Sequence, residues 1–319
     1  MIKKIILLSG DPNSINSELI FKIWKKINNT LKKKIYLISN YNLINKQFRK
    51  LNYKIKTIKV KSIDDKIKTN ELKILNIDLN SKKTFDISKK LASKFIKESL
   101  DLAHELASTK KRCGIINCSI DKKLFKKKNI GVTEYLSLKC GIKDKSETML
   151  IFNKELAVSP ITIHDDLKNI SKKITKKKII IKVKIINKWY KKYYNLKPKI
   201  GILGLNPHNA ELRKNSEEKK IIVPAITDLK KMTININGPY VADTFFIKDF
   251  KKFDIIVGMY HDQVLTPFKT LYKFNAINIT LGLPYIRISP DHGVAKDIIG
   301  KNKADTTSLI NCLKFINSF

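Results

Sequence analysis

The sequence predicts an α/β fold built on largely parallel sheets. Short apolar runs of strand length alternate with segments of helical periodicity along the 319 residues. Several of these apolar runs are followed directly by polar residues, histidine among them. Such alternation is typical of parallel strands joined by helices that cover the sheet. No apolar run approaches the roughly 18 residues that a membrane-spanning helix requires, so we expect no membrane association.

The first elements follow in order from the amino terminus. Ile5–Leu8 predicts a buried strand, and a helix is expected near Ser17–Leu31, with Lys34–Ser39 as the next strand. The initial apolar run is too short for a signal peptide and leads directly into Gly10-Asp11-Pro12, so we expect a cytoplasmic protein. The Lys-, Asn- and Asp-rich stretch Leu51–Lys89 is expected to form strands and surface loops.

Later strands are predicted wherever a short apolar run ends in a turn. They are Gly114–Asn117, Glu155–Ile161, Lys199–Leu205, Asp254–Met259 and Ala276–Leu281. Between residues 176 and 194, one helical face is apolar and the other carries lysines. That face comprises Ile179, Val183, Ile186, Tyr190 and Tyr193, and Pro198 is expected to end the helix.

The formal net charge of +37 raises the possibility of nucleic-acid binding. However, only four of the 65 basic residues are arginine, and Lys, Ile and Asn, the residues of AT-rich codons, are abundant. A surface selected for phosphate contacts is expected to use more arginine, whose planar fork suits phosphate. We therefore attribute the charge to codon bias and expect no nucleic-acid partner. The cysteines, Cys113, Cys118, Cys140 and Cys312, form no C-x-x-C pair and are expected to be reduced.

Three of the five histidines follow predicted strands. His164, His208 and His261 come after Leu156–Ile161, Lys199–Leu205 and Asp254–Met259, whereas His104 lies in a helical pattern and is expected at a surface or cap. The carboxyl ends of parallel strands open onto a common crevice, so these three side chains can converge. Three imidazoles with an open position are the ligand set of a catalytic metal such as zinc.

The sequence motifs around these histidines resemble those of the 4-hydroxythreonine-4-phosphate dehydrogenase family of pyridoxal phosphate biosynthesis. The matching segments are Leu203-Gly204-Leu205-Asn206-Pro207-His208, Gly238–Thr244, Met259–Gln263, Asn278–Arg287, Asp291-His292-Gly293, Gly300-Lys301 and Lys303-Ala304-Asp305. Weaker similarity reaches back to Gly10-Asp11-Pro12, so the resemblance covers the whole chain.

The resemblance implies an isocitrate/isopropylmalate dehydrogenase-like fold. It implies two α/β/α sandwich subdomains with the active site in the cleft between them, divided as residues 1–128 plus 275–319 and residues 129–274. The implied reaction is NAD(P)-dependent oxidation of 4-phosphooxy-L-threonine at C3. The resulting 2-amino-3-oxo-4-phosphooxybutanoate has its carboxylate β to the ketone and decarboxylates to 3-amino-2-oxopropyl phosphate. A homodimer is also implied, with the active site at the subunit interface and metal ligands drawn from two chains.

The resemblance carries over residue by residue. His164, His208 and His261 match the metal ligands, and the substrate contacts match Thr133, Lys269, Asn278 and Arg287. Asp243 and Asp262 are candidates for proton transfer. Because Asp291–Lys301 is similar to the cofactor loop of isocitrate dehydrogenases, Asp291, His292, Gly293 and Ala295 are assigned to NAD or NADP. Three imidazoles favour zinc over magnesium, with magnesium or cobalt as alternatives.

The chain departs from the family that it resembles mainly before residue 220. A substrate-contacting histidine is replaced by Val132, and the family's Thr-Gly-Pro-x-x-Lys is here Asn117-Cys118-Ser119-Ile120-Asp121-Lys122. A glycine-rich loop after Asn-Pro-His has become Asn209–Ser216, and the later glycines of the amino-terminal motif are lost. These departures leave open a weaker enzyme, a related substrate such as a phosphoerythronate, or a nucleic-acid-binding protein on a retired enzyme scaffold.

Overall fold

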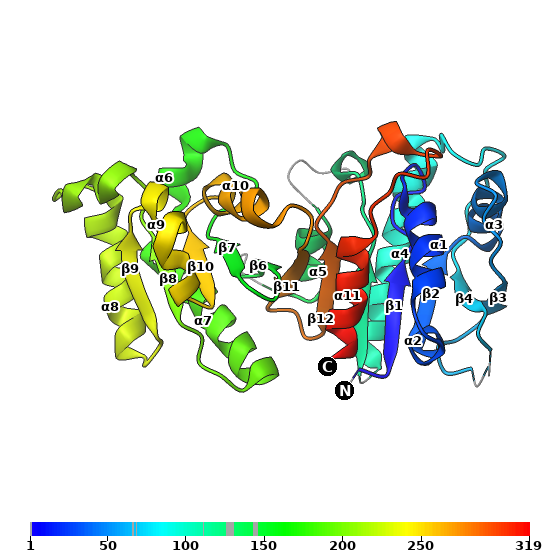
Figure 1. Ribbon diagram of the computed structural model, residues 1–319, viewed down its shortest axis with the longest axis horizontal. Helices are drawn as coiled ribbons and strands as arrows, with labels where there is room; N and C mark the ends of the chain where they lie inside the picture. Colours follow the sequence, from blue (N-terminus) through cyan, green and yellow to red (C-terminus); the bar gives the residue numbers. More distant parts are fainter. Residues whose placement is uncertain (1, 66, 68, 111, 126–130, 143–145) are drawn as a thin grey trace. The chain divides into compact units, whose positions relative to one another are not determined.

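The computed structural model describes residues 2–65, 67, 69–110, 112–125, 131–142 and 146–319. The chain divides into two compact units, coloured by sequence in Figure 1. Unit 1 comprises Met1–Gly141 and Leu283–Phe319, and unit 2 comprises Ile142–Gly282. The predicted boundary between residues 128 and 129 lies outside the described residues.

The sheet of unit 1 is parallel throughout the described strands. These are β1 (Lys4–Leu8), β2 (Ile35–Ser39), β3 (Thr57–Val60), β4 (Leu72–Asn76), β5 (Cys113–Asn117) and β12 (Ile286–Pro290). They lie in the order β3-β4-β2-β1-β5-β12, and each neighbouring pair is parallel. Parallel neighbours need crossover connections, and helices supply most of them. The connection from β3 to β4, residues 61–71, contains no helix among its described residues.

The helices of unit 1 are mostly short. They are α1 (Asn16–Lys26), α2 (Asn29–Lys34), α3 (Tyr41–Lys50), α4 (Lys89–Thr109), α5 (Val132–Lys139), α11 (Thr307–Asn317) and the single turns η1 (Lys122–Leu124) and η6 (Lys296–Ile298). The single helix expected near Ser17–Leu31 is two helices. The first ends at Lys26, where Ile27 takes an extended conformation, and Asn28 caps the second, because its Oδ1 accepts from Leu31 N at 2.9 Å.

The core of unit 1 lies between α4 and the sheet. Phe95 and Leu100 of α4 are buried against Ile6 and Ile115 of the central strands. His104 is inside α4, where its Nδ1 lies 3.0 Å from the buried Tyr285 hydroxyl. His104 is half-buried and does not cap α4, whose caps are Ser88 and Lys110, so the capping alternative is wrong.

The sheet of unit 2 is mixed. Its described strands are β6 (Thr148–Phe152), β7 (Ala157–Pro160), β8 (Ile200–Leu203), β9 (Ile236–Tyr240), β10 (Ile255–Gly258) and β11 (Ile277–Leu281). They lie in the order β11-β6-β7-β10-β8-β9, in which β6 is antiparallel to β7 and β11 and the remaining neighbours are parallel. The predicted α/β fold with largely parallel strands is confirmed.

The helices of unit 2 include the predicted amphipathic helix. They are η2 (Leu167–Asn169), α6 (Ile170–Lys173), α7 (Lys176–Tyr194), η3 (Pro207–Leu212), η4 (Glu218–Ile222), α8 (Val223–Lys231), α9 (Ala242–Lys248), η5 (Asp249–Lys252) and α10 (His261–Tyr272). Thr175 caps α7 by accepting from Lys178 N, and the helix ends at Asn195 in the left-handed region. Of the apolar face, Ile179, Val183, Ile186 and Tyr190 are buried as predicted.

Candidate functional site

The three histidines follow neighbouring strands of unit 2. His164 comes after β7, His208 after β8, and His261 begins α10 directly after β10. The order β7-β10-β8 is continuous and all three strands run parallel. Their carboxyl ends therefore lie along one edge of the sheet, as the sequence predicted. We call this edge, with His164, His208 and His261, the histidine edge.

Two of these histidines lie near each other. The ring centres of His164 and His261 are 6.1 Å apart, and His261 Nδ1 lies 2.6 Å from Asp262 Oδ1. The side chain of His208 is exposed. Within the part of the chain that the structure describes, His, Cys, Asp and Glu side chains form no group of three arranged to hold a metal ion. A single chain therefore brings two predicted ligands close together, and the three-ligand set stays a prediction.

Hydrogen bonds tie these strand ends together. Thr162 Oγ1 donates to the carbonyl of Met259 at 2.8 Å, which joins the ends of β7 and β10. Gln263 joins β10 to β8: its Oε1 accepts from Met259 N and its Nε2 donates to the carbonyl of Gly204, both at 2.7 Å. The backbone that precedes each histidine is thus held in a common frame.

The remaining predicted residues of unit 2 lie on three different elements. Asn278 is on β11, and its Oδ1 is buried without a hydrogen-bond partner in the described structure. Lys269 is in the last turn of α10, with its ammonium 5.5 Å from the ring centre of Phe274. Asp243 is exposed in the first turn of α9. A buried amide oxygen at Asn278 suits a hydrogen-bonding ligand.

Arg287 forms a buried charge centre in unit 1. Its side chain lies on β12 with 3% of the residue exposed. The Nε donates to Asn117 Oδ1 at 2.7 Å, and Nη1 donates to Thr133 Oγ1 at 3.2 Å. Burial lowers the pKa of Arg287 to about 10, and the charge of Glu134 opposes that shift. Two predicted substrate contacts, Thr133 and Arg287, therefore meet around one cation that stays charged at neutral pH.

The start of α5 places Thr133 at this centre. Gly131 precedes the helix, and its N–H donates to Glu134 Oε2 at 2.9 Å. Val132, which stands where the family has histidine, packs against the apolar cluster of unit 1. The substitution therefore exchanges a polar contact for apolar packing at the first residue of α5.

The segment assigned to the cofactor packs against loops at the carboxyl ends of β1 and β5. Ser119 Oγ lies 3.0 Å from His292 Nδ1 and donates to the His292 carbonyl at 2.8 Å. The Val294 carbonyl accepts from Ile15 N at 3.2 Å. His292 Nε2 is buried and has no hydrogen-bond partner among the described residues. The segment is thus joined to the turn that precedes α1.

The other residues of this segment are more open. Asp291 N donates to Ser308 Oγ at 2.8 Å, which anchors the segment to α11. A Cβ added at Gly293 would meet no atom within 4 Å among the described residues. Ala295 is left-handed, with φ of 44°, and the following Lys296 Nζ pairs with Asp121 Oδ2 at 3.1 Å. Space beside Gly293 and a nearby cation are compatible with a phosphate-bearing ligand.

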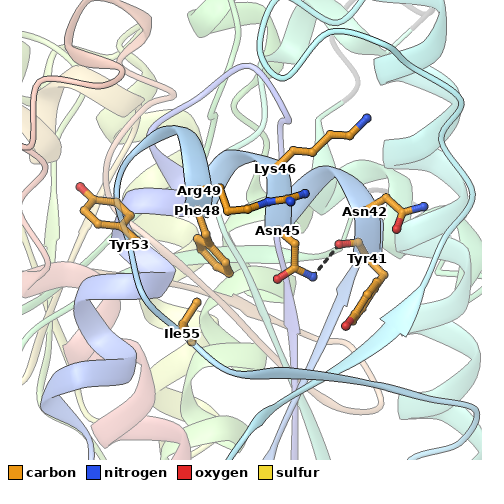
Figure 2. A pocket seen from close by; sticks show the side chains of 8 residues that line it. All are labelled: Tyr41, Asn42, Asn45, Lys46, Phe48, Arg49, Tyr53 and Ile55. Carbon is orange, nitrogen blue, oxygen red and sulfur yellow. Dashed lines mark hydrogen bonds between the residues drawn. The ribbon is translucent and has the colours of Figure 1, made fainter.

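A separate cavity of about 480 Å³ lies along α3 of unit 1, shown in Figure 2. It is lined by Tyr41, Asn42, Asn45, Lys46, Phe48, Arg49, Tyr53 and Ile55. Asn45 Nδ2 donates to the Tyr41 carbonyl at 2.8 Å across its wall. None of the predicted site residues is part of this lining.

A family model described as pyridoxal phosphate biosynthetic protein PdxA matches residues 15–316. The chain belongs to the PdxA family. The 4-hydroxythreonine-4-phosphate dehydrogenase of Sulfurihydrogenibium sp. is 47% identical over 186 residues, 58% of this chain and 57% of the relative. That of Aquifex aeolicus is 40% identical over 207 residues, 64% of each chain. The matched stretches thus span less than two thirds of these relatives.

Solved structures confirm the fold expected of a PdxA chain. A 4-hydroxythreonine-4-phosphate dehydrogenase from Klebsiella pneumoniae has a TM-score of 0.84 at 22% identity, covering 99% of this chain and 98% of that chain. Isocitrate dehydrogenase from Methylococcus capsulatus has a TM-score of 0.53 at 10% identity, covering 99% and 85%. The isocitrate dehydrogenase-like fold that the resemblance implied is therefore confirmed.

The PdxA motifs did not reveal every residue that holds this arrangement. Asn117 and Ser119 occupy positions where the family motif is altered, yet they bind Arg287 and His292. Gln263 lies within a recognised motif but without an assigned role, and Glu218 had no signal of its own. Among the described helices, none combines the length and apolar character needed to cross a membrane.

Proposed function

We propose that this chain is a metal-dependent NAD(P) dehydrogenase of 4-phosphooxy-L-threonine in pyridoxine 5'-phosphate biosynthesis. The observation that carries the proposal is the alignment of His164, His208 and His261 at the ends of adjacent parallel strands in a PdxA-family chain. The substrate is oxidised at its C3 alcohol, and the product β-keto acid loses CO₂ to leave 3-amino-2-oxopropyl phosphate.

The histidine edge suits a divalent metal by its donor chemistry. Three imidazoles are the ligands of many catalytic zinc sites, and zinc is favoured here over magnesium or cobalt. A bound ion supplies Lewis-acid polarisation of the alcohol or ketone oxygen. Asp262 contacts His261 Nδ1 at 2.6 Å and orients that ring. We propose that association of two copies of the chain completes the set of metal ligands.

The charge centre of unit 1 suits the anionic groups of this substrate. The guanidinium of Arg287 is already held by Asn117 and Thr133, and its charge can pair with the substrate phosphate or carboxylate. In unit 2, Asn278 Oδ1 can accept from the substrate amino group, and Lys269 provides a second cation. Asp243 and Asp262 are the proposed proton-transfer groups.

NAD or NADP supplies the hydride acceptor in this proposal. Asp291, His292, Gly293 and Ala295 are the residues proposed to contact it, because the segment is similar to the cofactor loop of isocitrate dehydrogenases. The homodimer, the cleft between two sandwich domains and the predicted domain division are part of the same proposal. Comparing kcat/KM with NAD⁺ and with NADP⁺ identifies the cofactor.

The direct experiment measures NADH or NADPH formation from 4-phosphooxy-L-threonine with added Zn²⁺, Mg²⁺, Mn²⁺ or Co²⁺. His208→Ala is expected to abolish turnover and metal content together. Lys230→Ala, at an exposed residue of α8, is the control and should keep both. Absence of turnover with every metal and both cofactors would overturn the specific reaction. Turnover that survives in His208→Ala would overturn the metal assignment.

Val132 favours a second candidate within the same reaction class. Since valine cannot donate the hydrogen bond of the family histidine, the substrate of this chain can differ at the group that the histidine contacts. A phosphorylated hydroxy acid such as a phosphoerythronate is the alternative. A higher kcat/KM for that acid than for 4-phosphooxy-L-threonine would select it.

A further inference from the structure

The backbone that carries His208 is left-handed for five consecutive residues. The φ angles from His208 to Leu212 are 50°, 55°, 48°, 46° and 53°, and glycine occupies none of these positions. L-amino acids disfavour this region because Cβ crowds the following carbonyl. The family has a glycine-rich loop here, so this chain forms the turn with residues that resist it. Its neighbours must therefore hold it.

Glu218 holds the start of this turn. It is fully buried at the start of η4, with 0% exposed. Its Oε1 accepts from the backbone N–H of Leu205 and of Asn206, both at 2.8 Å, and its Oε2 accepts from Asn206 Nδ2 at 3.1 Å. Burial acts to raise the pKa of Glu218, but these hydrogen bonds outweigh it and leave that pKa lowered. An ionised carboxylate thus fixes both residues that lead into Pro207.

The same turn is held on its other side by Asn209. Its Nδ2 donates to the Pro239 carbonyl at 2.9 Å, which ties the turn to β9. A Cβ at Gly204 would clash with Asn209 Oδ1 and would lie 3.2 Å from Glu218 Oε1. The close approach of Asn209, Gly204 and Glu218 leaves the turn little room to shift while these contacts persist.

We propose that Glu218 is the positioning residue for His208. Its carboxylate keeps the turn left-handed, so that His208 is presented at the end of β8 beside the ends of β7 and β10. This inference rests on the proposed role of His208 as a metal ligand. A turn released from Glu218 would spend most of its time in other conformations, and the apparent metal affinity would fall by the fraction still competent.

The test uses Glu218→Gln in the full chain, which keeps the side-chain shape but removes the charge and turns one acceptor into a donor. We expect Co²⁺, used as the probe metal, to bind about tenfold more weakly, because charge-assisted hydrogen bonds are lost. At saturating Co²⁺, kcat is expected to return toward the wild-type value. Hydrogen exchange is expected to quicken at the amides of residues 204–212 alone.

Two further variants separate positioning from general support of the fold. Glu217→Gln is the matched control. Within the described part of the chain Glu217 accepts from the Asn206 side chain at 2.9 Å and not from the backbone of Leu205 or Asn206, so Co²⁺ affinity should stay within about twofold. Leu212→Gly, at an exposed residue with φ of 53°, makes the left-handed conformation accessible at no steric cost. Added to Glu218→Gln, it is expected to restore most of the lost Co²⁺ affinity.

The outcomes are distinct. Wild-type exchange rates and Co²⁺ affinity in Glu218→Gln would overturn the inference, as would faster exchange throughout unit 2 without rescue by Leu212→Gly. If the wild-type chain neither binds Co²⁺ nor turns over, the proposed function fails. Exchange confined to residues 204–212 would then still support Glu218 as the anchor of the turn.

Discussion

The charge centre around Arg287 in unit 1 and the histidine edge of unit 2 are built in opposite ways. Arg287 is buried in a strand and bonded to Asn117 and Thr133, although the motif around Asn117 departs from the family. The sequence motifs around the three histidines match the family, yet His208 is exposed and lies on a strained turn. The difference teaches that a matching motif does not ensure an unstrained site, and that an altered motif can still satisfy a buried charge.

The largest effect is expected from Arg287→Met. This change removes the buried cation and leaves the Asn117 and Thr133 oxygens without its donors, so kcat/KM should fall by roughly 100-fold or more. The free energy of unfolding should fall as well, measured by urea denaturation. Arg49→Met, at an exposed arginine of the same unit, is the control and should leave both unchanged. A kcat/KM within about threefold of wild type would remove Arg287 from the site.

A smaller effect is expected from Asn117→Ala, which tests whether Asn117 positions Arg287 although the family motif is altered at this residue. The buried Arg287 Nε loses its acceptor at 2.7 Å, and about 1–2 kcal/mol of substrate binding is expected to be lost, mainly as a raised KM. Asn117→Thr restores the family residue and its hydroxyl acceptor, so it should recover part of the loss. Equal KM values in all three proteins would show that Asn117 does not position the guanidinium.

Val132→His tests the one departure that removes a polar contact. Restoring an imidazole beside Thr133 should lower KM for 4-phosphooxy-L-threonine by about tenfold or more, because a hydrogen bond to a charged group contributes about 1.5–3 kcal/mol. Val132→Leu keeps the apolar packing and serves as the control. If Val132→His raises KM for this substrate, the site is adapted to a different phosphorylated acid.

The smallest effect on activity is expected from Lys73→Met, at a second buried cation of unit 1. Lys73 is 2% exposed, its Nζ bonds the Lys33 carbonyl, and burial lowers its pKa from 10.5 to about 8. Below pH 8 Lys73 is protonated in both the folded and the unfolded chain, so the folded state bears the whole free-energy cost of burying the charged ammonium. That cost disappears as pH rises toward 10.5.

Replacing Lys73 by Met should therefore stabilise the protein by on the order of 1–2 kcal/mol near neutral pH, with kcat/KM unchanged. The wild-type chain should gain stability relative to the variant as pH rises from about 8 to above 10, measured by urea unfolding. A loss of activity in Lys73→Met would mean that Arg287 is not the only buried cation that matters to the site. Equal pH dependence of stability in both proteins would contradict the lowered pKa.

The most regular elements could be predicted from the sequence. Helix α7 has a strict apolar face, and strands β1, β8 and β10 are short apolar runs that end in polar residues, so periodicity alone identified them. The position of the three histidines after adjacent strands followed from those assignments. Such predictions depend on residues that are close together in the chain.

The rest depended on contacts that local patterns do not contain. Arg287 and Asn117 are 170 residues apart, and their pairing is set by the neighbouring strands β12 and β5. The break between α1 and α2 lies at the extended Ile27 and is followed at once by the Asn28 cap of α2. The left-handed turn after Pro207 contains no glycine that would have indicated it. Glu218, which we propose holds this turn through Leu205 and Asn206, lies 13 and 12 residues from them in the chain.

Unit 1 is assembled from both parts of the chain, since Leu283–Phe319 joins Met1–Gly141. Synthesis from the amino terminus therefore delivers all of unit 2 before β12 can pair with β5. Arg287 arrives on that last strand, and until then Asn117 and Thr133 have no guanidinium to bind. A nascent chain released before β12 would carry every predicted metal ligand but not Arg287, so the proposed contact with the anionic groups of the substrate can form only after unit 2 has been synthesised.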